Sequence, residues 1–230
     1  MTENNSPLTY RYGSNFDPNN LDTDRVVLCG LAIDCSPSIT SFEGELTRAI
    51  RAFVDQSKTQ SFSEELMLQM VTFSSDVKME TGFQPISALD SSLINITSRR
   101  GLTAGYDAAK QTLDSMLAYG KTLENSGTDV RYIFIILTDG EFNDGMDSNG
   151  SSVSAILNDI KKDESLYGKF SAFLYGVGDQ ATFDDARARM GLKPDAMLTF
   201  GATGSDFMRM IDCVSKSISQ SSSGKAVPTF

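Results

Sequence analysis

The sequence of 230 residues contains no histidine and no tryptophan. Without histidine a Ser-His-Asp hydrolase site cannot form, and the sequence also lacks a G-x-S-x-G stretch. Neither G-x-x-x-x-G-K-[ST] nor G-x-G-x-x-G follows the first apolar stretch, so a nucleotide would lack its phosphate-binding loop. These absences remove the commonest hydrolase and nucleotide-binding chemistries. We therefore expect a binding protein and not an enzyme.

Positive charge is also scarce. The 20 Lys and Arg residues face 30 Asp and Glu residues, which gives a formal net charge of −10 and a pI near 4.5. Nucleic-acid backbones and anionic membranes are poor partners for such a surface. No apolar run approaches the ~20 residues that a membrane span needs. We expect neither a nucleic-acid partner nor a membrane partner, and favour a cationic or metal-mediated contact.

The sequence contains three cysteines, an odd number, at positions 29, 35 and 213. Cys29 and Cys213 fall in apolar patterns and are interpreted as small core residues, whereas Cys35 is expected to be partly exposed. The usage fits a reducing compartment, and the N-terminus does not resemble a signal peptide. The expected location is cytoplasmic.

The stretch VVLCGLAIDCSPS, from Val26 to Ser38, organises the rest of the chain. Its first part has no polar face, which is typical of a central strand covered on both sides. Asp34 ends this run, and Ser36 and Ser38 follow at alternate positions. Ligands bind at the carboxyl ends of the strands in an α/β sheet. A carboxylate and two hydroxyls at that place indicate ligands for a hard cation.

Two further oxygen donors complete the candidate set. Thr103 stands in GLTAG just ahead of an expected helix, and Asp139 follows a second apolar strand in YIFIILTDG. Mg²⁺ takes about six oxygen ligands and suits one or two carboxylates combined with neutral oxygens. The predicted metal ligands are therefore Asp34, Ser36, Ser38, Thr103 and Asp139. Mg²⁺ is the expected ion, with Mn²⁺ or Ca²⁺ as alternatives.

Apolar strands alternate with amphipathic helices along the chain, which predicts a doubly wound, mostly parallel α/β sheet with helices on both faces. Residues 1–22 form a polar leader, 23–219 the domain, and 220–230 a flexible tail. Tyr10, Tyr12 and Phe16 either pin the leader to the domain or form a recognition segment, and pinning is favoured. The expected helices cover about 41–56, 103–119, 153–160, 183–190 and 207–218, and the strands 26–33, 65–73, 77–83, 130–137, 170–177 and 196–200.

The D-x-S-x-S sequence at Asp34, the threonine before a helix and the T-D-G after an apolar strand together resemble the von Willebrand factor A domain, over roughly residues 24–219. The sequences FSSDV, LTDGEFND and YGVG are similar to small bacterial members encoded with tellurium-resistance and stress genes. Pro37 departs from the family, which usually has glycine there. The resemblance implies six strands, one of them short and antiparallel at the edge.

The resemblance further implies a metal-ion-dependent adhesion site. In such a site Ser36, Ser38 and Thr103 coordinate directly, Asp34 and Asp139 act mostly through metal-bound water, and a Glu or Asp of a partner protein completes the shell. A kinase or phosphatase of the same operon is an expected partner, in a stress or signalling system.

Other interpretations remain open at this point. Taken singly, each of the five residues is also a suitable helix cap or turn residue. A metal-dependent phosphatase or hydrolase that uses Asp34 is the alternative function, although no general base accompanies the set. Arg99 and Arg100 are either surface charges or groups that meet an acidic partner. The acidic loop at 141–147 lacks the closing glutamate of a calcium loop.

Overall fold

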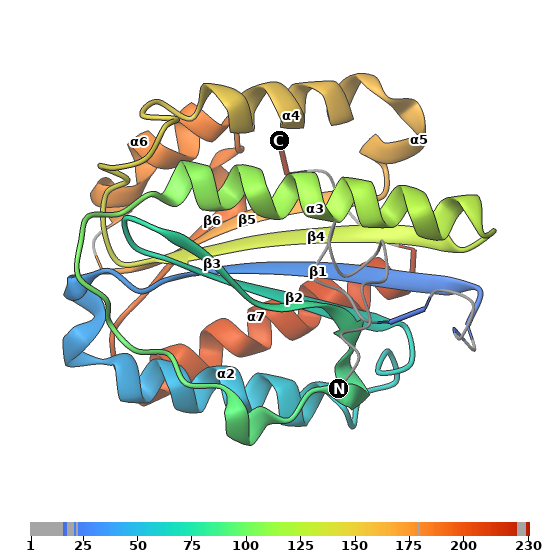
Figure 1. Cartoon of the computed structure of the whole chain (residues 1–230), viewed down its shortest axis with the longest axis horizontal. Coiled ribbons are helices and arrows are strands. Elements are labelled where there is room, and N and C mark those ends of the chain that lie inside the picture. Colours follow the sequence, from blue (N-terminus) through green and yellow to red (C-terminus); the bar gives the residue numbers. More distant parts are fainter. Residues whose placement is uncertain (1–15, 18–20, 22, 179, 225–228) are drawn as a thin grey trace, which may run out of the picture.

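The computed structural model describes residues 16–17, 21, 23–178, 180–224 and 229–230 of the chain. Its core is a six-stranded sheet in the order β3-β2-β1-β4-β5-β6, in which only β3 is antiparallel to its neighbour (Figure 1). The strands are β1 (Arg25–Asp34), β2 (Leu66–Phe73), β3 (Val77–Pro85), β4 (Asp129–Thr138), β5 (Phe170–Val177) and β6 (Met197–Phe200). The predicted fold class is confirmed.

Helices cover both faces of the sheet. In the part of the chain that the structure describes they are α2 (Glu43–Ser57), α3 (Gly105–Asn125), α4 (Ser151–Lys162), α5 (Glu164–Tyr167), α6 (Gln180–Met190) and α7 (Gly204–Ser222). The apolar residues of α3, α4 and α6 share one core cluster with one face of the sheet, and those of α2 and α7 share a second cluster with the other (Figure 1). The result is a three-layer α/β/α arrangement.

β1 lies at the centre because both of its faces are apolar. Every residue of the strand after Arg25 is buried, and alternate side chains enter the two core clusters, as Leu28 and Cys29 do. Gly30 allows α3 to approach closely, since a Cβ at this position would lie 2.5 Å from Met116 Sδ. Parallel pairing with β2 and β4 brings the carboxyl ends of these strands to one edge.

Helices α3 and α7 extend furthest beyond their expected carboxyl-terminal ends. α3 continues past Tyr119 to Asn125, because Gly120 makes room for the Tyr132 ring and Leu123 keeps the apolar face buried. α7 continues to Ser222, four residues past the last apolar position that the pattern showed.

The end of the chain differs from the flexible tail that we expected. Thr229 is buried, and its hydroxyl oxygen accepts a hydrogen bond from the Ala172 N–H at 2.8 Å. The Phe230 ring is also buried and makes edge-on contacts with Tyr167 and Phe170, with ring centroids 5.8 Å apart in each case. Phe230 is therefore part of the core, and Thr229 is bonded to β5 beside it.

Phe16 and Leu21 of the leader pack, partly buried, against the core cluster that contains α3. This agrees with pinning at Phe16, whereas Tyr10 and Tyr12 lie outside the described residues. Among the described helices, none is long and apolar enough to cross a membrane.

Candidate metal centre

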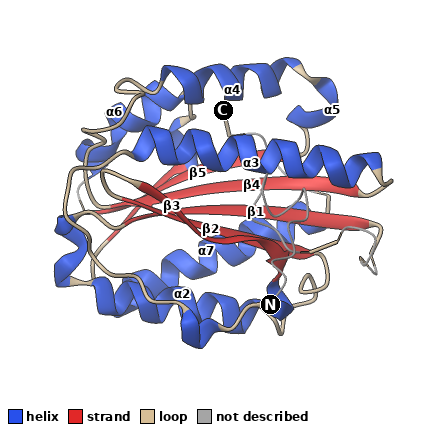
Figure 2. Cartoon of the chain, viewed as in Figure 1, coloured by secondary structure: helices blue, strands red, loops and turns tan. Residues whose placement is uncertain are grey.

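The candidate site lies where β1, β2 and β4 end. Asp34 is the last residue of β1, Thr138 is the last residue of β4, and Asp139 follows directly. The loops after β1 and β4 and the segment before α3 meet at this edge, at the left of the sheet in Figure 2. The position agrees with the rule that ligands of α/β sheets bind at the carboxyl ends of strands.

Hydrogen bonds join four of the five predicted residues. Asp34 Oδ1 accepts from the Ser36 N–H at 2.7 Å, and the Ser36 and Ser38 hydroxyl oxygens are 2.9 Å apart. Ser38 Oγ in turn donates to Asp139 Oδ1 at 2.7 Å. The structure therefore brings the carboxylate at the end of β1, the carboxylate just after β4 and the two serine hydroxyls into one continuous network.

Thr103 reaches the same edge on a different segment. The residues Arg99–Ala104, which we call the strap, cross the ends of β1 and β2. The Arg99 N–H donates to Cys35 O at 2.7 Å, and the Ala104 N–H donates to Ser74 O at 2.7 Å. The side chain of Thr103 is buried, and its hydroxyl makes no hydrogen bond within the described part of the chain. That hydroxyl is free to bind a ligand.

Two residues that support the site were missed in the sequence. Thr138 Oγ1 donates to Asp34 Oδ2 at 2.6 Å, so both carboxylate oxygens of Asp34 accept a hydrogen bond. Asn143 Oδ1 accepts from the Thr103 N–H at 2.9 Å and holds the strap from the other side. Both residues lie in the LTDGEFND segment, Thr138 as the threonine of T-D-G, but neither was assigned a role in the site from the sequence.

The electrostatics of the site favour a cation. Burial raises the pKa of the Asp34 carboxyl, although hydrogen bonds from Thr138 and Ser36 oppose this rise. Burial also raises the pKa of Asp139, the negative charge of Asp34 adds to the rise, and the Ser38 hydroxyl opposes it. Asp34 is buried and Asp139 is partly buried, and a positive ion beside them would stabilise both carboxylates in their ionised form.

The donor set determines which kind of ion fits. No cluster of three or more His, Cys, Asp or Glu side chains suited to a metal occurs among the described residues. Two carboxylates and three hydroxyls are instead hard oxygen donors, which suit Mg²⁺ or Mn²⁺ better than a soft metal. The residues present therefore fit a hard divalent cation.

Neighbouring residues have other roles. Cys35 is 1% exposed, contrary to our expectation, and burial raises the pKa of its thiol to about 12, so it is not a reactive thiolate. Asp147 of the acidic loop caps α4, since its Oδ2 accepts from the Ser152 N–H at 2.9 Å.

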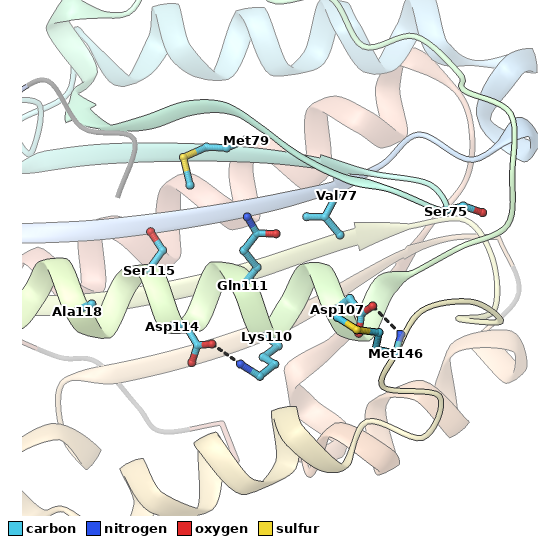
Figure 3. A pocket seen from close by; sticks show the side chains of 10 residues that line it. All are labelled: Ser75, Val77, Met79, Asp107, Lys110, Gln111, Asp114, Ser115, Ala118 and Met146. Atoms are coloured by element: carbon cyan, nitrogen blue, oxygen red, sulfur yellow. Dashed lines mark hydrogen bonds and ion pairs between the residues drawn. The ribbon is translucent and has the colours of Figure 1, made fainter. Parts of the chain in front are cut away.

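A hollow of about 880 Å³ lies elsewhere, between β3 and α3 (Figure 3). Val77 and Met79 of β3 face Gln111 and Ser115 of α3 across it. None of the five candidate ligands lines this hollow, so it is separate from the metal site.

Comparison with known proteins gives the same family as the sequence motifs. The family model for the von Willebrand factor type A domain matches residues 30–221. No curated protein matches the sequence.

Solved structures share the fold at low sequence identity. The PilB minor pilin from Streptococcus sanguinis is 12% identical, with a TM-score of 0.59 over 86% of this chain and 62% of its own. A von Willebrand factor type A protein from Catenulispora acidiphila is 14% identical, with a TM-score of 0.55 over 84% of this chain and 43% of its own. Proximal thread matrix protein 1 from the mussel byssus, with a zinc-occupied MIDAS motif, is 12% identical, with a TM-score of 0.53 over 84% and 45%.

This chain thus spans less than two thirds of the length of these structural relatives. The family model, however, covers most of the chain itself, and the six-stranded sheet agrees with it. The chain belongs to the von Willebrand factor type A domain family.

Proposed function

We propose that this protein is a metal-dependent protein-interaction module that binds a Glu or Asp of a partner protein at a Mg²⁺ site. The observation that carries the proposal is the hydrogen-bonded network of Asp34, Ser36, Ser38 and Asp139 at the carboxyl edge of the sheet. Its two carboxylates are buried enough to have raised pKa values, and its hydroxyls are hard neutral donors.

In this proposal the hydroxyl residues bind the ion directly and the carboxylates act indirectly. Both oxygens of Asp34 already accept hydrogen bonds from protein donors, so Asp34 suits contact with the ion through water. Ser36, Ser38 and Thr103 supply the direct ligands, and Asp139 orients Ser38. The ion supplies an electrophilic position that a partner carboxylate can fill.

The enzyme alternative lacks a base. The sequence contains no histidine, and both carboxylates of the site are occupied with the hydroxyls and N–H groups around them. Domains of this family are typically interaction modules, which agrees with binding and not hydrolysis as the role. The similarity to small bacterial members with stress genes is our reason to place the protein in a cytoplasmic stress or signalling system, with a kinase or phosphatase as its partner.

Metal binding is tested by isothermal titration calorimetry with Mg²⁺ and Mn²⁺. We expect about one equivalent of ion to bind, and Asp34→Ala to abolish binding. Asp55→Ala is the matched control, because Asp55 is an exposed carboxylate of α2 whose ion pair, among the described residues, is with Lys58 just after that helix. Equal binding by wild type and Asp34→Ala would show that the ion binds elsewhere.

Partner binding is tested by capture from the native cell with Mg²⁺ or with EDTA, followed by mass spectrometry. A partner held through the ion is captured with Mg²⁺, lost in EDTA and lost with Thr103→Ala. Thr122→Ala is the control, since the Thr122 hydroxyl of α3 lies away from the site and, among the described residues, donates to the Ala118 carbonyl of the same helix. A protein captured equally in EDTA binds another face of the domain.

A further inference from the structure

Arg99 is not an ordinary surface charge, although it stands next to Arg100 in the sequence. Its side chain is 25% exposed and turns toward the end of the sheet. Nη1 donates to Thr72 Oγ1 at 2.7 Å, Nε lies 3.3 Å from Asp76 Oδ1, and Nη1 lies 3.9 Å from Glu80 Oε1. The planar guanidinium therefore contacts β2, the turn after β2, and β3 at once.

The backbone of the same residue holds the metal loop. The Cys35 carbonyl accepts from the Arg99 N–H at 2.7 Å, and the Cys35 N–H donates to Phe73 O at 2.7 Å. Cys35 stands between the candidate ligands Asp34 and Ser36. The loop is thus fixed on both sides at its central residue, once by β2 and once by Arg99.

Arg99 is also the first residue of the strap that carries Thr103. Further along the strap, the Leu102 N–H donates to Ser75 Oγ at 2.7 Å. Gly101 adopts a φ of +124° there, and a Cβ at this position would clash with Ser75. The position of the Thr103 hydroxyl relative to the β1 loop therefore depends on how the start of the strap is anchored, and the Arg99 side chain is that anchor.

Arg100 offers the natural comparison. It has the same charge and is exposed, and its side chain makes no hydrogen bond or ion pair within the described residues. Arg99 and Arg100 therefore carry the same charge and differ only in their side-chain contacts within the described residues.

We propose that Arg99 is a positioning residue of the metal site, which holds the β1 loop and the strap so that the Ser36, Ser38 and Thr103 hydroxyls converge. The inference rests on the proposed metal-dependent function, and it assigns Arg99 no contact with the ion. Partners of metal ligands commonly change metal affinity by about 10-fold to 100-fold when they are mutated.

Loss of the Arg99 charge and loss of its anchoring contacts have opposite expected effects on the Mg²⁺ affinity of Arg99→Gln. Removing a positive charge from beside a cation site strengthens cation binding by Coulomb's law. Loss of the anchor instead weakens binding, because the hydroxyl ligands must then be ordered by the ion itself. We expect the second effect to win. Arg99→Lys keeps the charge but cannot reproduce the planar contacts with Thr72 and Asp76, and it should weaken binding as well.

The experiment titrates Mg²⁺ by calorimetry into wild type, Arg99→Gln, Arg99→Lys and Arg100→Gln. A second readout, amide hydrogen exchange of segments 34–41 and 99–104, is taken on the same proteins in EDTA. We expect both Arg99 variants to bind Mg²⁺ about 10-fold to 100-fold more weakly and to exchange faster in both segments, whereas Arg100→Gln binds as wild type or slightly more tightly. Thermal melts establish that each variant is folded, and Arg99→Lys decides the question if Arg99→Gln does not fold.

The two proposals fail in different ways. If wild type binds no Mg²⁺, the proposed function is wrong. If wild type binds Mg²⁺ and the Arg99 variants bind it at least as tightly, only the positioning role of Arg99 is wrong. Unchanged exchange of both segments in the Arg99 variants also refutes that role.

Discussion

Replacement of Thr138 by valine tests whether Asp34 is a buried charge that needs its hydrogen bonds. Thr138 is 1% exposed, and its hydroxyl donates to Asp34 Oδ2 at 2.6 Å and accepts from the Gly140 N–H at 3.2 Å. Valine keeps the shape of the side chain and removes the hydroxyl. Asp34 Oδ2 then loses its hydrogen bond, although Asp34 is only 1% exposed and water cannot easily replace the hydroxyl.

The expected loss follows from the charge state of Asp34. A hydrogen bond to a charged group contributes about 1.5–3 kcal/mol, and one between neutral groups about 0.5–1.5 kcal/mol. We therefore expect the free energy of unfolding of Thr138→Val to fall by about 1.5–3 kcal/mol at a pH above the folded pKa of Asp34, where its carboxyl is ionised. For a domain of this size such a loss lowers Tm by roughly 3–12 °C.

The loss should depend on pH. Burial already raises the pKa of Asp34 in the folded protein, so ionisation of this group costs stability as pH rises from the unfolded pKa through the folded pKa. Valine removes a hydrogen bond that favours the ionised form and so raises the folded pKa further. The difference between variant and wild type is therefore smallest below the unfolded pKa, which is about 3.9, and largest above the folded pKa.

Urea denaturation in EDTA at pH 3.5 and pH 7.5 measures both values. Thr112→Val is the matched control, because Thr112 is fully buried and its hydroxyl donates to the neutral Ala108 carbonyl at 2.8 Å. The control should lose about 0.5–1.5 kcal/mol and show no pH dependence. If Thr138→Val loses no more stability than the control, or loses equal amounts at both pH values, Asp34 is not the buried charge that the structure indicates.

Asp34→Asn should raise the free energy of unfolding of the EDTA-treated domain at pH 7.5, because burial penalises the ionised carboxyl of Asp34. The same change should abolish the rise in Tm that Mg²⁺ gives the wild type. At 100 times its Kd, Mg²⁺ stabilises the wild type by about 2.7 kcal/mol, or roughly 5–11 °C in Tm; an equal rise in the variant would contradict the assignment. Gly30→Ala should destabilise the fold by about 1–3 kcal/mol in urea, since its Cβ would lie 2.5 Å from Met116 Sδ and 2.7 Å from Thr112 Cγ2. Gly44→Ala, in open space on α2, should instead stabilise it by about 0.5–1 kcal/mol, and a similar effect of both changes would refute the close approach of α3 to β1.

The elements of the sheet were predictable because their signals are local. The all-apolar run of β1 predicts a strand covered on both faces, and the pattern of 170–177 predicts a strand with the bounds that β5 has in the structure. Helix ends were less predictable. α3 continues through Gly120, which looks like a stop signal in the sequence but serves the packing of Tyr132 from another strand.

The candidate site was likewise predictable only in part from the sequence. The sequence by itself determined the family, the α/β class and the five oxygen donors, because the D-x-S-x-S, T and T-D-G segments each stand at a strand end or a helix start. Whether the five are metal ligands stays a prediction.

Only the tertiary structure decided which residues support the donors. Thr138 contacts Asp34 across 104 positions of sequence, and Arg99 contacts Thr72 across 27. Such contacts depend on the order of the strands in the sheet and leave no periodic pattern in the chain. For the same reason Arg99 and Arg100 cannot be told apart in the sequence, whereas the fold encloses the Arg99 guanidinium among Thr72, Asp76 and Glu80 and leaves that of Arg100 in solvent.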